Sequence, residues 1–190
     1  MKLRFFLALG LWLAFSVACS DNSGIAPPVT KNQVDTFTLW ATRDSNLAEP
    51  SGFSVSGQGF GPQVVLTQDN PSFDFVYNVD DAGTSVFLTT QVLGVVSSVS
   101  IHPGFQPSQR TFDSVVTAPL NNYITEDTIH LAVGQVWYMR SALFCAALSS
   151  PLYGKLEVLS IDSMGRSVTF RALVDSNCGY HGLSPGLPSN

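Results

Sequence analysis

The chain has 190 residues, of which 45% are hydrophobic and 12% are charged, and its net charge at pH 7 is −5. Proteins that bind nucleic acid need a basic face, so this acidic balance excludes nucleic acid as a partner. It also argues against electrostatic binding to anionic lipid. The length suits one domain with a sizeable core.

The first 18 residues have the pattern of a removable signal peptide. Lys2 and Arg4 precede an apolar run that extends to residue 18. As a helix this run would be about 21 Å long at about 1.5 Å per residue, shorter than the roughly 30 Å hydrocarbon core of a membrane. We therefore predict export, with cleavage before Cys19. Without Lys2 and Arg4, seven of the nine basic residues remain against 14 acidic ones, so the exported chain carries a net charge of about −7.

The residues at the cleavage point resemble the lipobox of bacterial lipoproteins. That pattern consists of a leucine or branched residue, two small residues and the cysteine that receives diacylglycerol. Val17 and Ala18 match it, and Ser16 stands where leucine is usual. The resemblance implies that Cys19 is a lipid anchor, and Ser20 after it implies an outer-membrane lipoprotein that faces the periplasm or the cell surface. The alternative is a plain secretory cleavage that leaves a cysteine at the new N-terminus.

The next segment separates the anchor from the folded part of the chain. Residues 20–32, SDNSGIAPPVTKN, are polar, contain proline and show no hydrophobic periodicity. Such a segment buries too little apolar surface to offset the conformational entropy that it would lose on folding. This composition is typical of a disordered tether. We therefore divide the chain into a signal peptide (1–18), a lipidated N-terminus with a flexible tether (19–33) and a β-sandwich domain (34–190).

The domain has almost only strand patterns. Alternation of apolar and polar residues predicts strands at 34–41, 63–67, 73–79, 84–90, 95–101, 129–141, 154–162 and 167–175. DDAG at 80–83 and SMGR at 163–166 join two hairpins. Joints rich in glycine or proline are expected at 56–62, 102–109 and 150–154, a single turn at 112–118, and a helical or loop insert at 141–148. We predict an all-β fold, a single antiparallel β-sandwich or partly closed barrel.

One strand also predicts what covers the sheet. In 167–175, the residues on one face are Val168, Phe170, Ala172 and Val174, and the opposite face is mostly polar. Leu173 interrupts that polar face, so we expect the outer face to be partly covered.

The cysteines predict one disulfide. If Cys19 is acylated, Cys145 and Cys178 remain as an even pair in an oxidising compartment. A bridge between them closes a loop of about 34 residues and stabilises the fold by roughly 3 to 4 kcal/mol. The alternative is two buried free thiols. The spacing offers no CxxC pair and no histidine cluster, so no metal site is predicted.

No catalytic motif stands out. GFSVSG at 52–57 misses the GxSxG pattern of a nucleophile elbow by one place. Asp80 with Asp81, and Glu126 with Asp127, have the pattern of turn residues. We therefore predict a protein that is not an enzyme. The alternative is an extracellular hydrolase whose acidic residues converge only in the fold.

The candidate ligand-binding residues are His102, His130, His181 and Tyr153. No histidine lies within four residues of another, which excludes a local metal-binding pair. His102 and His181 fall in expected loops, and Tyr153 is an aromatic residue beside a glycine. Loops and chain ends on a rigid β scaffold often carry ligand groups.

Four segments resemble the β-rich lipoproteins of the HmuY-like group, some of which are haemophores. They are SFDFVYNVD (72–80), VGQVWYMRS (133–141), LYGKLEVLSID (152–162) and SVTFRALV (167–174). The resemblance implies a β-rich fold in a lipoprotein setting. The haem-ligating histidines of the family match no motif here, so haem is only an alternative cofactor, held by His102, His130 or His181.

These observations predict a non-catalytic binding or interaction module of the bacterial cell envelope. It is exported and lipid-anchored, so its first partner is a membrane, and its ligand or protein partner is unknown. No cofactor is predicted for this function. The alternatives are a haem- or porphyrin-binding lipoprotein and the extracellular hydrolase.

Overall fold

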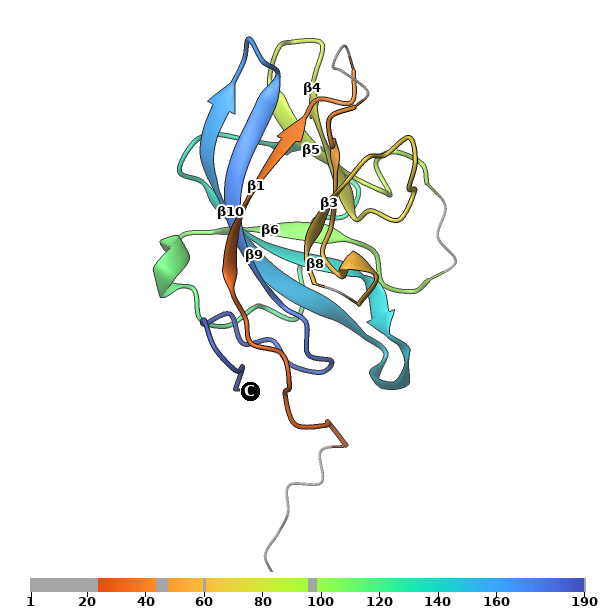
Figure 1. Cartoon of the computed structure of the whole chain (residues 1–190), viewed down its shortest axis with the longest axis vertical. Helices are drawn as coiled ribbons and strands as arrows, with labels where there is room; N and C mark the ends of the chain where they lie inside the picture. The colour runs from red at the N-terminus through yellow and green to blue at the C-terminus, as the bar shows by residue number, and fades with distance from the viewer. Residues whose placement is uncertain (1–23, 44–47, 60, 96–98, 190) are drawn as a thin grey trace, which may run out of the picture.

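The computed structural model describes residues 24–43, 48–59, 61–95 and 99–189. Within them the chain forms two antiparallel five-stranded sheets that pack face to face (Figure 1). The predicted all-β sandwich is therefore confirmed. The predicted signal peptide and Cys19 lie outside the described residues.

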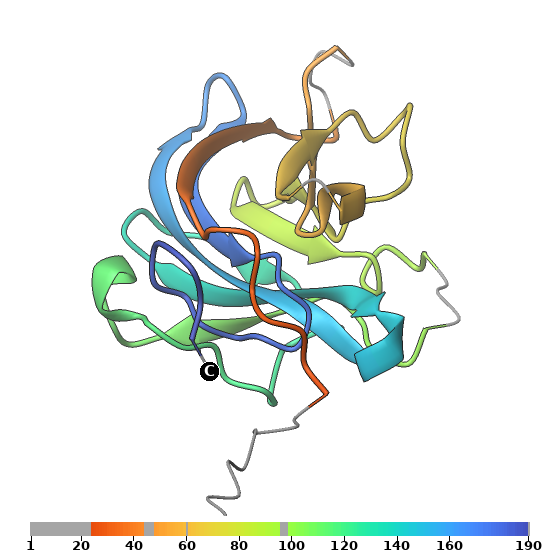
Figure 2. The same cartoon turned by 60° about the horizontal axis from the view of Figure 1, so that its bottom comes forward.

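The first sheet contains the long strands of the molecule. Its order is β1 (Val34–Trp40), β10 (Ser167–Asp175), β9 (Ser150–Asp162), β8 (Val136–Cys145) and β6 (Gly104–Ser108). The predicted hairpin around SMGR is β9 and β10, which pair from Ser167 opposite Asp162 to Asp175 opposite Tyr153. This sheet curves around the inner core (Figure 2).

The second sheet is built from shorter strands. Its order is β3 (Gln63–Val65), β2 (Gly52–Ser54), β4 (Phe75–Val79), β5 (Ser85–Thr89) and β7 (Ile129–His130). The predicted DDAG hairpin is β4 and β5. Three short 3-10 helices complete the elements: η1 (Gly57–Gly59), η2 (Phe112–Ser114) and η3 (Ala146–Leu148).

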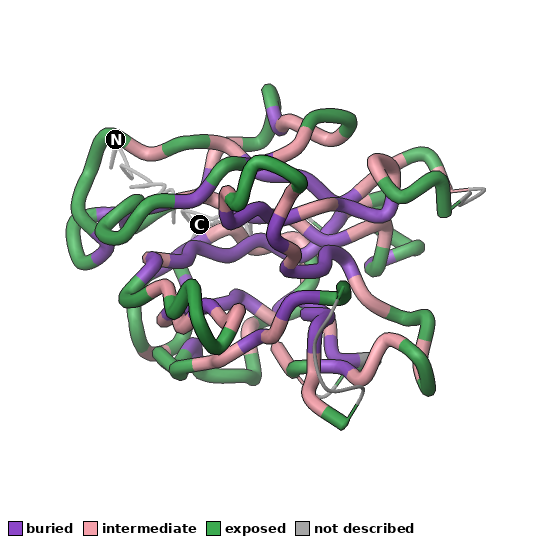
Figure 3. Tube along the Cα trace, turned by 90° about the horizontal axis from the view of Figure 1, so that it is seen from above, coloured by how far each residue is buried: buried purple, intermediate pink, exposed green. Residues whose placement is uncertain are grey.

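Phenylalanine rings fill the space between the sheets. The ring centroid of Phe75 lies 5.1 Å from that of Phe53, 4.7 Å from Phe87 and 4.8 Å from Phe105. Rings at these separations add to the stability that their buried area provides. The buried residues accordingly concentrate between the two layers (Figure 3).

A second, smaller core lies on the outer face of the first sheet. Leu173 and Tyr153 pack there against Phe112 and Val115 of the η2 region and against Leu183 near the C-terminus. Leu173 is completely buried, which confirms that the outer face is covered. Lys155 is buried with them, and its Nζ donates to the carbonyls of Phe112 and Val115, both at 2.8 Å.

The structure corrects the prediction of one continuous strand at 129–141. That segment is split between β7 in the second sheet and the start of β8 in the first. Between them, Gly134 has a φ of 83° and Gln135 N–H donates to the carbonyl of Ala132. Glycine adopts this left-handed conformation without the steric penalty of other residues, so the chain turns there and changes sheets.

Two expected joints, 102–109 and 150–154, are instead largely strand. A Cβ at Gly154 would lie 2.7 Å from the Met139 side chain, and a Cβ at Gly104 would lie 2.9 Å from the Ile124 carbonyl. These glycines therefore allow close packing and do not form turns. Pro107 is tolerated because β6 is an edge strand.

Three further differences concern shorter segments. The described residues of 95–101 form no strand, whereas 52–54 do form one, β2. The insert expected at 141–148 continues β8 as far as Cys145 and only then becomes η3.

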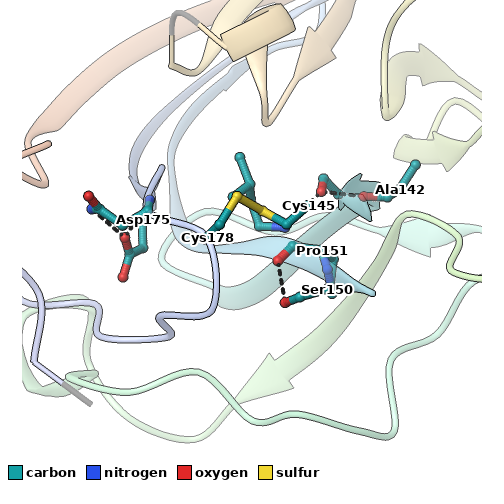
Figure 4. Close-up of a disulfide and its surroundings, with 9 residues drawn as sticks. Ala142, Cys145, Ser150, Pro151, Asp175 and Cys178 are labelled. Carbon is teal, nitrogen blue, oxygen red and sulfur yellow. Dashed lines mark hydrogen bonds between the residues drawn. A yellow bond between two sulfur atoms is a disulfide. The ribbon is translucent and has the colours of Figure 1, made fainter. Parts of the chain in front are cut away.

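Cys145 and Cys178 form the predicted disulfide. Their Cα atoms are 5.6 Å apart, within the range that a disulfide spans. The bond joins the end of β8 to the segment that follows β10 (Figure 4).

Candidate functional site

The structure places the four predicted ligand-binding residues in different surroundings. Tyr153 lies in β9, not in a joint, and is only 7% exposed. Its ring centroid is 6.2 Å from that of Tyr123. Burial raises the pKa of both phenols, so they stay neutral and serve as packing groups.

Arg140 connects the backbone of His102 to this pair of tyrosines. The Arg140 Nε donates to the His102 carbonyl at 3.1 Å, and its guanidinium carbon lies 4.9 Å from the Tyr123 ring centroid. Arg140 also pairs with Tyr153 across β8 and β9. The connection uses the backbone carbonyl of His102, and the Nδ1 of its imidazole is buried without a hydrogen-bond partner.

The other two histidines lie elsewhere. His130 is exposed on β7 opposite Val86. His181 follows the disulfide, and its carbonyl accepts the Ala118 N–H at 2.9 Å. None of the three histidines lines a groove described below. Haem binding therefore remains a prediction, and the positions of the three histidines outside these grooves do not support it.

A groove of about 430 Å³ opens at the edge of the first sheet, where β6 ends and β8 begins. Its lining residues are Pro107, Ser108, Gln109, Arg110, Thr111, Gly134, Gln135, Val136, Trp137 and Glu157. They come from three separate segments, because Pro107 pairs with Trp137 and Val136 pairs with Glu157 across neighbouring strands. This groove, called the Trp137 groove below, combines one large aromatic ring with several exposed polar side chains.

The polar groups of the Trp137 groove are partly fixed in place. Gln135 Oε1 accepts the Ala132 N–H at 2.9 Å and the Trp137 Nε1–H at 3.3 Å. These contacts fix the orientation of the side-chain amide and leave its NH₂ group able to donate elsewhere. Trp137 is anchored from beneath by Phe105, with their ring centroids 6.4 Å apart. A held aromatic ring beside oriented polar groups is a typical ligand-binding arrangement.

One wall of the groove carries an ion-pair network. Arg171 Nε donates to Glu157 at 2.6 Å, and Arg171 NH2 lies 3.5 Å from Asp113. The guanidinium carbon of Arg171 also lies 4.2 Å from the Phe112 ring centroid. Arg171 therefore holds both nearby carboxylates. Glycoside hydrolysis needs one carboxyl to give up a proton and the other to act as nucleophile or base, whereas here both accept from one cation.

The predicted turn carboxylates keep a structural role. Asp80 Oδ1 accepts the N–H groups of Ala82 at 2.9 Å and Thr84 at 2.7 Å, and Asp81 pairs with Arg43. Among the residues that the structure describes, no three His, Cys, Asp or Glu side chains form a group that could hold a metal ion.

The N-terminal segment is bonded to the far end of the chain. Asn177 Oδ1 accepts the N–H groups of Val29 at 2.9 Å and Thr30 at 3.0 Å, and Asn177 Nδ2 donates to the Thr30 carbonyl at 2.9 Å. Asn32 and Gly186 exchange two backbone hydrogen bonds. The packed part of the chain therefore begins inside the segment predicted to be tether.

The groove residues Arg110, Gln135 and Trp137 were not expected from the sequence. Trp137 fell inside the predicted strand 129–141, and Arg110 followed an expected joint. The available signal was Gly134, whose turn exposes Gln135 at the mouth of the groove.

Across the described ranges, no helix is long and apolar enough to cross a membrane. Comparison of the chain with protein-family models, with curated proteins and with solved structures found no match.

Proposed function

We propose that the protein is an exported, lipid-anchored and non-catalytic binding module of the bacterial cell envelope, and that it binds its ligand in the Trp137 groove. The observation that carries the binding function is this groove. It brings Trp137, which packs partly against the inner core, together with exposed polar residues of neighbouring segments. The signal-peptide pattern and Cys19 support export and anchoring.

The chemistry of the groove favours a saccharide. A sugar ring has an apolar face that packs on an aromatic ring and a rim of hydroxyls that need donors and acceptors. Trp137 supplies the aromatic surface. Arg110 and the Gln135 NH₂ group supply donors, and Gln109 supplies an acceptor. Because the groove is open along the sheet edge, one or a few sugar units of a longer chain fit better than an enclosed small molecule.

Saturation-transfer NMR with neutral mono- and oligosaccharides tests the ligand class. We expect transfer from the protein to at least one sugar, and we expect Trp137→Ala to abolish it because the stacking surface is lost. Trp40→Phe, at the end of β1, is the matched control and retains the signal. A panel that shows no transfer, or transfer that Trp137→Ala leaves intact, contradicts saccharide binding in this groove.

A further inference from the structure

One end of the domain carries almost no charge. The segments 22–30, 141–154 and 176–190 contain no Asp, Glu, Lys or Arg, a property that they share with 50–68 and 82–109. All charged side chains of the exported chain therefore lie outside these three segments, with Asp21 directly before the first of them. The first segment belongs to the stretch before β1, called the N-terminal strap below. The second contains the β8–β9 turn, and the third is the C-terminal tail.

The three segments meet in space. The Cys145–Cys178 disulfide joins the β8–β9 turn to the C-terminal tail. At Gly179, an added Cβ would lie 3.0 Å from the Leu148 side chain and 3.1 Å from that of Ile25. All three segments therefore touch around the disulfide. We call this region the neutral end.

The neutral end exposes apolar side chains and is hollowed. Phe144 is 39% exposed, Leu148 38% and Val29 87%. A groove of about 290 Å³ beside the disulfide is lined by Gly24, Ala26, Cys145, Ala146, Ala147, Leu148 and Cys178. Every lining residue is apolar or a disulfide cysteine, so this surface gains by leaving water.

The position of the chain outside the described residues points to the occupant. Gly24 lines the apolar groove and lies five residues after Cys19. Even fully extended, five residues span at most about 18 Å. The Asn177 bonds to Val29 and Thr30 fix the following residues to the domain. A lipid on Cys19 would therefore hold a bilayer within about 18 Å of the neutral end.

We infer that the neutral end rests on the lipid surface, with Phe144, Leu148 and their neighbours in the headgroup region of the bilayer. Apolar groups in this position gain free energy as they enter the interface, and no charged side chain of the three segments loses its hydration. The acidic remainder of the domain then faces away from the membrane. The inference rests on the proposed anchor at Cys19.

The test introduces a tryptophan at this surface in the full chain. Leu148→Trp protein is purified from bacterial membranes and reconstituted in phosphatidylcholine vesicles with brominated acyl chains, which quench nearby indoles. We expect the brominated chains to quench part of the fluorescence that the new tryptophan adds, as for a side chain in the interface. Met164→Trp is the matched control, because Met164 is 95% exposed in the turn at the opposite end of β9, and it keeps its fluorescence (Figure 1). Ala147→Trp repeats the measurement if Leu148→Trp does not fold.

Palmitate labelling of the same preparations separates the two claims. Labelled protein without quenching at residues 147 and 148 keeps the anchor and overturns the membrane contact. Unlabelled protein with quenching rejects the anchor and supports the contact, whereas unlabelled protein without quenching rejects both. A doubled mass in detergent that Leu148→Asp reduces to a monomer assigns the neutral end to a second copy of the chain and overturns the inference.

Discussion

Asp74 bonds to backbone groups from both sheets. Its Oδ2 accepts the Val55 N–H at 2.7 Å, just after β2, and its Oδ1 accepts the Ala142 N–H at 2.9 Å, in β8. The residue is 6% exposed. Burial raises the pKa of the carboxyl from 3.8 to about 6, and the two N–H bonds oppose that rise. A single side chain thus makes sandwich stability depend on pH.

The pH dependence has a definite sign. Because the folded pKa of Asp74 is above the unfolded value, the folded state binds the proton more tightly. The free energy of unfolding therefore falls as pH rises from about 4 to about 7, by up to about 3 kcal/mol from this group. Urea unfolding across this range measures the slope, and Asp74→Asn flattens it. If the Asn variant keeps the wild-type slope, another group causes it.

At the scale of elements, the disulfide holds the uncharged β8–β9 turn against the C-terminal tail. Beyond Tyr153, β8 and β9 pair irregularly, with register shifts between Arg140 and Leu143 and between Leu143 and Cys145. Irregular pairing leaves fewer ladder hydrogen bonds to hold this end of the hairpin. The covalent bond therefore adds to the few ladder bonds that hold the turn.

Loss of the disulfide lowers stability without changing the fold. We expect Cys145→Ala/Cys178→Ala to reduce the free energy of unfolding by roughly 3 to 4 kcal/mol, because the unfolded chain regains the entropy of an open loop of about 34 residues. Urea midpoints of the oxidised protein, the reduced protein and the double variant measure the loss. Reduction that shifts the wild type but leaves the double variant unchanged is the control. Equal midpoints for all three preparations contradict the prediction.

Several elements followed directly from the sequence. The hairpin at 154–175 could be predicted because residues 167–175 alternate apart from Leu173 and a glycine stands in the turn. Two of the errors came from glycines and a proline that serve packing or edge positions. Gly104 and Gly154 have the composition of joints, yet they lie in strands because a neighbouring segment passes too close for a Cβ. A single sequence does not distinguish that requirement from the need for a turn.

For the whole molecule, the disulfide could be predicted and the groove could not. If Cys19 is the lipid anchor, only Cys145 and Cys178 remain, and they can form only one disulfide. The Trp137 groove instead joins residues 107–111, 134–137 and Glu157, which strand order alone brings together. His102, His130 and His181 illustrate the converse, because chemically suitable residues remained apart once the topology was known.

The lipid anchor is tested on the intact protein. We expect radiolabelled palmitate to enter the exported chain and Cys19→Ser to abolish the label, because the serine cannot form the thioether to diacylglycerol. Globomycin, which blocks the lipoprotein signal peptidase, leaves the precursor uncut. Cys178→Ser is the matched control and keeps the label. Removal of the signal peptide without labelling contradicts the anchor.

The Asn177 bonds to the strap also decide how the domain responds to a pull on its N-terminus. β1 is an edge strand, and a force applied at its first residue would peel it from β10 one hydrogen bond at a time. The hydrogen bonds of Val29 and Thr30 to Asn177 lie between the N-terminus and β1, so they are loaded before β1 is. Asn177 directly precedes Cys178 in the chain. A pull on the N-terminus is thus transmitted to β8 through the disulfide, and the β1 edge of the sandwich is spared.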